Sequence, residues 1–198
     1  MKYDIRRLTL AADTLLETNT NPRHRRILGN YRRHAMLEVS GRYEEIFTPE
    51  MTVEHPFYRI CSADGVIELD GLEAVQGFYQ SLIDNNSTVM LLEHENIIVN
   101  DWGFASEALF HSFIPAETAA TNGHEVPDMN AKYIESRWVC MMWHFDEAGR
   151  MIGERVYQAP TASLEKCPEE DFLTLDHARS VFDPISVSYT HLTLPTNA

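Results

Sequence analysis

The chain has 198 residues, the length of one domain with a short extension, and it is 44% hydrophobic and 23% charged, as is typical of a globular protein with one core. Its 16 Lys and Arg are outnumbered by 30 Asp and Glu, and the net charge of −14 argues against nucleic acid or an anionic membrane surface as the main partner. No apolar run reaches the roughly 20 residues that span a bilayer, and charges within residues 1–16 argue against a signal peptide.

The first part of the chain is predicted to be helical. Residues 4–17 place apolar side chains at helical spacing, and we assign residues 1–21 to an N-terminal helical extension. Asn21 is a suitable N-cap for a longer helix that is predicted to run to about Ser40. A short helical stretch is predicted over 42–47.

Basic side chains concentrate in the same region. Residues 1–42 hold nine Lys or Arg and four Asp or Glu, whereas the rest of the chain holds seven and twenty-six. A basic arm for an acidic partner or a phosphate would have this composition. A helix face that complements the acidic body of its own or a neighbouring subunit would have it too, and we favour this second interpretation.

In the middle of the chain, apolar and polar residues alternate as they do in β-strands. Short strands are predicted over 51–58 and 66–69, and Asp70 is expected to cap a helix that carries Tyr79. A polar loop that could lie over a cavity mouth is expected over 115–130. Longer strands are predicted over 89–99, 104–114, 133–145 and 151–158.

This order of elements predicts an α+β fold. Helices come first, one helix is inserted between the early strands, and a long meander follows. A curved mixed or antiparallel sheet packed against the N-terminal helices would form a cone with an interior pocket. We place this cone domain at residues 22–160 and a C-terminal tail at 161–185.

The last residues are excluded from the fold. Residues 186–198 read SVSYTHLTLPTNA, carry no charge, and resemble the in-frame translation of a sequencing adapter. We expect the native sequence to be cut off near Ile185, and His191 is discounted as a site.

Cysteine usage and the absence of common motifs limit the chemistry. Cys61, Cys140 and Cys167 are odd in number, far apart and without a CxxC pair, which favours a reduced, cytoplasmic protein. The sequence has no HExxH, GxSxG, Walker A or GxGxxG motif, so neither a metal nor another cofactor is expected.

Four segments resemble the nuclear transport factor two-like superfamily, which includes ketosteroid isomerases and SnoaL-like polyketide cyclases. They are ILGNYRRHAMLEVSGRYEEIF, MTVEHPFY, DGLEAVQGFYQSLI and WVCMMWHFDEAGRMIGERVYQ, and together they cover about residues 25–160. The resemblance implies a SnoaL-like α+β barrel, frequent homodimers or larger homo-oligomers, and activities from isomerisation and cyclisation to dehydration. The superfamily also includes members that only bind or assemble, so the fold alone does not give the function.

The resemblance implies two catalytic residues. In the isomerases, a tyrosine on the first long helix hydrogen bonds the substrate carbonyl, and a carboxylate base precedes a proline in the next strand. Those positions correspond to Tyr31 and His55. An imidazole can take and return a proton near neutral pH, and a tyrosine can polarise a carbonyl. A structural histidine at the rim and a core tyrosine are the alternatives. Met141 stands where the isomerases carry a second oxyanion donor, which argues against steroid isomerisation.

Two further histidines lie on consecutive predicted strands. His94 and His111 are arranged similarly to the histidine pair of scytalone dehydratase-like members of the superfamily, and together they could exchange protons with a leaving hydroxyl. Strand phase decides whether they face the pocket, because a shift by one residue reverses every side chain. Two alternating sets of side chains are possible around His111, and the sequence does not decide which one points inward: Ser106, Ala108 and Phe110, or Glu107, Leu109 and His111.

The family register points Glu154 into the cone. A buried carboxylate needs a partner, and Arg137 or His55 are candidates. Glu154 would then be a second acid or base, a group that orients His55, or half of a structural ion pair. We expect the ligand contacts of the pocket to be Tyr58, Tyr79, Phe110, Arg137, Met141 and Trp143, although aromatic residues at this spacing are also typical of a core.

Two functions follow from these residues. The first is a cofactor-independent acid/base isomerase, cyclase or dehydratase that acts on an apolar carbonyl compound, with His55 as the main base. The second is a non-catalytic ligand-binding or assembly subunit of the same fold, like the small subunits of ring-hydroxylating dioxygenases. An open pocket would favour the first and a filled cone the second.

Overall fold

The computed structural model describes residues 2–186. The expected adapter translation lies outside the described residues, apart from residue 186. The helical elements are η1 (Ile5–Thr9), α1 (Leu10–Thr18), α2 (Pro22–Val39), η2 (Tyr43–Phe47), α3 (Leu72–Asp84), α4 (Ala116–Thr121), η3 (Glu169–Asp171) and α5 (Leu175–Ser186). The strands are β1 (Phe57–Ser62), β2 (Gly65–Asp70), β3 (Met90–Asn100), β4 (Gly103–Pro115), β5 (Lys132–Phe145), β6 (Met151–Gln158) and β7 (Ser163–Cys167).

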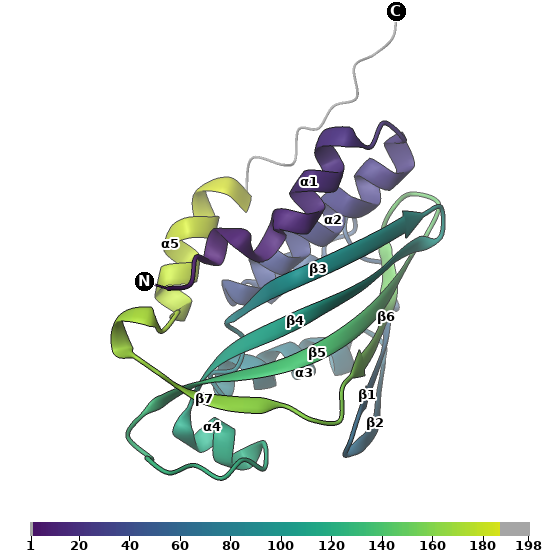
Figure 1. Cartoon of the computed structure of the whole chain (residues 1–198). Coiled ribbons are helices and arrows are strands. Elements are labelled where there is room, and N and C mark those ends of the chain that lie inside the picture. The colour runs from purple at the N-terminus through teal and green to yellow at the C-terminus, as the bar shows by residue number, and fades with distance from the viewer. Residues whose placement is uncertain (1, 187–198) are drawn as a thin grey trace, which may run out of the picture.

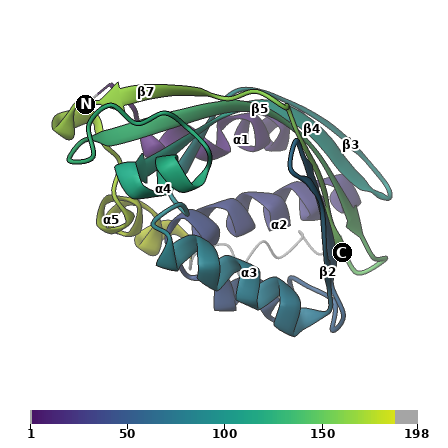
Figure 2. The ribbon, with the colours of Figure 1, turned by 90° about the horizontal axis from the view of Figure 1, so that it is seen from below.

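The seven strands form one mixed sheet, which confirms the predicted α+β class. The strand order is β2-β1-β6-β5-β4-β3, in which β1 and β6 are parallel and the other pairs are antiparallel. Strand β7 pairs with the first part of β5, and β6 pairs with its second part. The sheet is curved, and α2 and α3 lie across its concave side, with α4 at one end (Figures 1 and 2).

Helix α2 begins where the sequence predicts it. The Asn21 side chain accepts hydrogen bonds from the backbone N–H groups of Arg23 and His24, as an N-cap does. The helix ends at Val39, and Gly41 follows with a φ of +65°. Residues three and four positions apart share one face of a helix, so α2 presents Tyr31, His34 and Glu38 together.

Basic side chains of α2 bind the chain's own turns. Arg23 donates to the carbonyl oxygens of Asp101 and Asp146, which lie in the β3–β4 and β5–β6 turns. Arg26 donates to the carbonyl oxygen of Ala148. These contacts agree with a helix face that complements its own subunit.

A β-bulge reverses the phase of β3. The register with β4 shifts between Glu93 and Asn96, and His94 has a φ of +55°, which is unusual for a residue with a side chain. Before the bulge, Leu92 faces the concave side; after it, Glu95 reaches Tyr31 on α2. The bulge therefore turns an acidic side chain into the protein.

Four segments differ from the sequence prediction. Strand β1 begins at Phe57 rather than at residue 51, because Pro56 has no N–H to donate to a ladder. The N-cap of α3 is Gly71, with a φ of +90°, rather than Asp70. The polar loop contains α4, and residues 161–185 contain β7 and most of α5.

Helix α5 packs onto α2. Ala178 and Phe182 are fully buried, and Arg179 donates to the carbonyl oxygen of Ser40 at the end of α2. Within the described residues, none of the helices combines the length and the apolar character that crossing a membrane requires.

Candidate functional site

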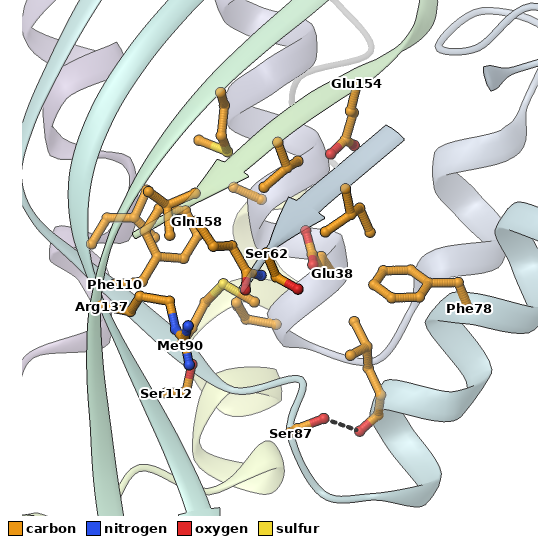
Figure 3. Close-up of a pocket in the computed structure, with 18 of the residues that line it drawn as sticks. Glu38, Ser62, Phe78, Ser87, Met90, Phe110, Ser112, Arg137, Glu154 and Gln158 are labelled. Atoms are coloured by element: carbon orange, nitrogen blue, oxygen red, sulfur yellow. Dashed lines mark hydrogen bonds between the residues drawn. The ribbon is translucent and has the colours of Figure 1, made fainter. Parts of the chain in front are cut away.

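An open pocket of about 360 Å³ lies between the concave side of the sheet and helices α2 and α3 (Figure 3). All six residues that the sequence nominates as ligand contacts line it: Tyr58, Tyr79, Phe110, Arg137, Met141 and Trp143. Tyr31 and Glu154 line it too. The roles of these residues toward a ligand stay predictions.

One end of the pocket is closed by a buried polar cluster. The Tyr79 hydroxyl lies 2.8 Å from Nε2 of His34 and donates to Oε1 of Glu154 at 3.4 Å. The Tyr58 hydroxyl lies 3.5 Å from that of Tyr79. Nε2 of His34 is also 3.6 Å from a carboxyl oxygen of both Glu38 and Glu154. Four elements, α2, α3, β1 and β6, thus bring these five side chains together.

Burial raises the pKa of three side chains in this cluster. Burial raises the pKa of Glu154 well above its ordinary value, and the negative charge of Glu38 raises it further, against the opposing hydrogen bonds of Tyr58 and Tyr79. Burial, assisted by the charge of Glu154, also raises the pKa of both tyrosines well above 10. Burial therefore favours the protonated carboxylic acid form of Glu154, and the two tyrosines keep their hydroxyl protons at neutral pH.

His34 is the member of the cluster that sequence reasoning missed. It is fully buried, its ring packs edge-on against Trp143 with centroids 4.5 Å apart, and its Nδ1 has no hydrogen-bond partner among the described residues. Its position three residues after Tyr31 and four before Glu38 was the available signal, because that spacing places all three on one helix face.

Tyr31 has a different partner from the one expected. Its hydroxyl donates to Oε1 of Glu95 at 2.5 Å rather than pointing free into the pocket. Burial raises the pKa of Glu95 from 4.5 to about 7, and the Tyr31 hydrogen bond opposes this shift. Tyr31 on α2 and Glu95 at the bulge of β3 thus form a second buried hydrogen-bonded group, separate from the cluster around His34.

His55 lies outside the pocket. Its side chain is 72% exposed, and Nε2 is 2.7 Å from Oδ1 of Asp70. The ring covers Gly71 at the start of α3. Because β1 begins only at Phe57, the inward alternation of the strand does not extend back to His55, and the structure does not bring it to Tyr31 or Glu154.

The other two histidines face the outer side of the sheet. The ring of His94 stacks on exposed Trp138 with centroids 6.4 Å apart. His111 is buried against Tyr3, with Nδ1 2.7 Å from the Ser136 hydroxyl. The inward set on β4 is the one that includes Phe110, which resolves the phase that the sequence left open.

The opposite end of the pocket is polar as well. Glu135 on β5 accepts hydrogen bonds from His124 at 2.6 Å and Asn122 at 3.3 Å, and this ties the loop after α4 to the sheet. Arg137, two residues on, donates to the carbonyl oxygen of Ala159. Among the described residues, no group of three or more His, Cys, Asp or Glu could hold a metal ion.

Comparisons with known proteins support the fold. No protein-family model and no curated protein matches the sequence. A candidate SnoaL-like polyketide cyclase from Jannaschia sp. CCS1 matches the structure with a TM-score of 0.52 and 12% identity, over 71% of this chain and 90% of that one. At this identity the likeness shows the fold alone, and the chain has the curved-sheet cone of that protein.

Two further solved structures match less closely. A candidate polyketide cyclase from Xanthomonas campestris pv. campestris has a TM-score of 0.49 and 14% identity, over 68% of this chain and 91% of that one. A nuclear transport factor two-like protein from Anabaena variabilis ATCC 29413 has a TM-score of 0.48 and 10% identity, over 73% and 95%.

Proposed function

We propose that this chain, which has the SnoaL-like fold of the nuclear transport factor two-like superfamily, is a cofactor-independent acid/base enzyme that moves a proton on a small carbonyl compound. The observation that carries the proposal is the pair of carboxyl groups at the closed end of the pocket. Glu38 and Glu154 both lie near His34, and burial together with the charge of Glu38 favours the protonated form of Glu154. A carboxyl group whose protonated form is favoured can serve as an acid, while a second carboxyl group in the same pocket serves as the base.

The proposed reaction uses each carboxyl group twice, once in each direction of proton transfer. The Glu38 carboxylate takes the proton from the carbon next to the carbonyl, and the Glu154 carboxylic acid gives its proton to the carbonyl oxygen, so that an enol forms. Where the enol is conjugated with a neighbouring C=C bond, return of the proton from Glu38 to the far carbon of that system, and of the hydroxyl proton to Glu154, moves the double bond and restores both groups. Tyr58 retains its hydroxyl proton and would donate it in a hydrogen bond that stabilises negative charge on the carbonyl oxygen as it develops.

In this proposal the pocket cluster replaces the imidazole base expected from the sequence. His55 is exposed, and His94 and His111 lie on the other face of the sheet, so none of the three reaches the pocket lining. Tyr31 contributes to the wall and orders Glu95.

The experiment measures solvent deuterium exchange next to the carbonyl by NMR, with a panel of cyclic and aryl ketones. The wild type should exchange at least one ketone faster than buffer does, and Glu154→Gln and Glu38→Gln should each slow that exchange by roughly 10²- to 10⁴-fold. Exposed Glu73 on α3 supplies the matched control, and Glu73→Gln should retain full activity. Ketones that bind the wild type without any exchange would overturn the proposal and favour a binding subunit.

We also propose that the chain forms a homodimer through the outer face of the sheet. Large apolar side chains are exposed there, among them Ile98 on β3, Trp138 on β5 and Tyr157 on β6. Exposed apolar side chains on one face of a sheet are typical of a protein interface.

A further inference from the structure

The two polar ends of the pocket are well separated. Arg137 and Trp143 lie six residues apart on β5, and Trp143 is paired with Glu154 on β6. At about 3.3 Å per residue, their positions on the sheet differ by roughly 20 Å. Figure 3 shows the Arg137 guanidinium beside Ser112 and the Glu154 carboxyl at the far side of the lining. One ligand group therefore cannot use both ends.

The Arg137 guanidinium has donors to spare. A guanidinium carries five N–H donors. In the described part of the chain, Arg137 makes one hydrogen bond, from Nη1 to the carbonyl oxygen of Ala159 at 3.0 Å, and its Nη2 is 3.8 Å from Oε1 of Glu135. The side chain is only 19% exposed, so water does not fully solvate these donors.

The nearest carboxylate, Glu135, pairs with Arg137 only at 3.8 Å and has closer partners. Oε1 of Glu135 accepts from His124 at 2.6 Å and from Asn122 at 3.3 Å, both shorter than its distance to Arg137. Two more polar groups line this end, the Ser112 hydroxyl and the Gln158 amide, and neither makes a side-chain hydrogen bond within residues 2–186. A half-buried cation beside two unused polar groups is a site for an anion.

We propose that this end of the pocket binds a carboxylate on the ligand, with Arg137 as the specificity-determining residue. The planar guanidinium matches a carboxylate with two parallel hydrogen bonds. Phe110, Met141 and Val156 line the pocket and would hold an apolar middle part. The ligand class is thus a keto acid whose carbonyl and carboxylate stand at opposite ends of an apolar body. The carbonyl end rests on the proposed function, whereas the carboxylate end does not.

The test is calorimetric binding of 4-phenylbutyrate and of its methyl ester, which has the same apolar body without the charge. The wild type should bind the acid at least tenfold more tightly than the ester. Arg137→Gln should lower the affinity for the acid by roughly 10- to 100-fold and change the affinity for the ester by less than about twofold. Arg137→Lys should have an intermediate affinity for the acid. Arg59 on β1, whose side chain is 43% exposed and paired with Glu68, supplies the control Arg59→Gln, which should change neither affinity.

Two outcomes would overturn the proposal of a carboxylate subsite. One is equal affinity of the wild type for acid and ester, and the other is an equal loss of both with Arg137→Gln. Because 4-phenylbutyrate has no ketone, the calorimetric result does not depend on catalysis: the subsite can stand where the deuterium exchange fails, and the exchange can stand where the subsite fails.

Discussion

His34 on α2 and Tyr79 on α3 are joined across the closed end of the pocket by a 2.8 Å hydrogen bond between Nε2 and the phenolic oxygen. Both residues are buried, and the Tyr79 hydroxyl also donates a hydrogen bond to Glu154. This link holds two helices against the sheet at the place where the proposed acid lies.

Removal of that hydroxyl should destabilise the fold. Tyr79→Phe leaves buried Nε2 of His34 without its shortest contact, and a buried polar group that loses its partner costs about 1–3 kcal/mol. Urea denaturation measures the change. The matched control is Tyr43→Phe, which loses an exposed hydrogen bond to Gln80 and should change the free energy of unfolding by less than about 0.5 kcal/mol. Equal effects of the two variants would contradict the buried network.

Stability should fall as the pH rises through the pKa of Glu95. Burial raises that pKa from 4.5 to about 7, so the folded state holds the proton more tightly than the unfolded state. The resulting stability is complete below about pH 4.5 and is lost as the pH passes about 7, a change on the order of 3 kcal/mol. Glu95→Gln keeps an acceptor for Tyr31 and removes the titration.

Urea denaturation of the wild type and of Glu95→Gln between about pH 5 and pH 8 measures this difference. Other groups titrate in both proteins, so the difference isolates Glu95. Curves that stay parallel over the whole range would show that Glu95 has an ordinary pKa.

Two glycines should respond oppositely to alanine. A methyl group added at Gly29 on α2 would meet no neighbouring atom within 4 Å, so Gly29→Ala should stabilise the helix by about 0.5–1 kcal/mol. A Cβ on Gly153 of β6 would lie 1.9 Å from the carbonyl oxygen of Phe57, so Gly153→Ala must disrupt the pairing of β1 with β6. We expect a loss of at least about 3 kcal/mol by thermal or urea denaturation. A well-tolerated Gly153→Ala would mean that the two strands are not so close.

The proposed dimer should depend on Trp138. Trp138→Glu places a charge on the outer face of the sheet and should shift the molar mass measured by light scattering from dimer to monomer at micromolar concentration. Leu10 on α1 is 52% exposed, which is comparable to the 44% of Trp138, and Leu10→Glu should leave the dimer intact. A monomeric wild type, or a Trp138→Glu dimer, would refute this interface.

Much of the scaffold was predictable because it follows from local patterns. Asn21 caps α2 as expected, since an N-cap depends on a few neighbouring residues. Alternation along β5 places Arg137 and Met141 on one face of the strand, and the resemblance pointed this face and Glu154 inward; in the structure all three side chains line the pocket.

The chemistry of the pocket was less predictable because it depends on contacts between distant segments. His34 acquires its role only when α3 brings Tyr79 beside it, 45 residues later in the chain. The bulge at His94 could not be predicted because the position with positive φ holds no glycine, and this bulge is what makes Glu95 face inward. The position of His55 came from the resemblance to the isomerases, and in this chain the strand begins only after Pro56, which leaves His55 outside the pocket.

The most direct test of the proposed chemistry is the titration of Glu154 by carbon-13 NMR, with glutamate labelled at its side-chain carboxyl carbon. Glu154→Gln assigns the signal by removing it. We predict that this signal keeps the chemical shift of a protonated carboxyl group at about pH 7, well above the ordinary glutamate pKa of about 4.3. A signal that titrates near pH 4.3 would show that Glu154 is ionised at neutral pH, and it would contradict its role as the acid.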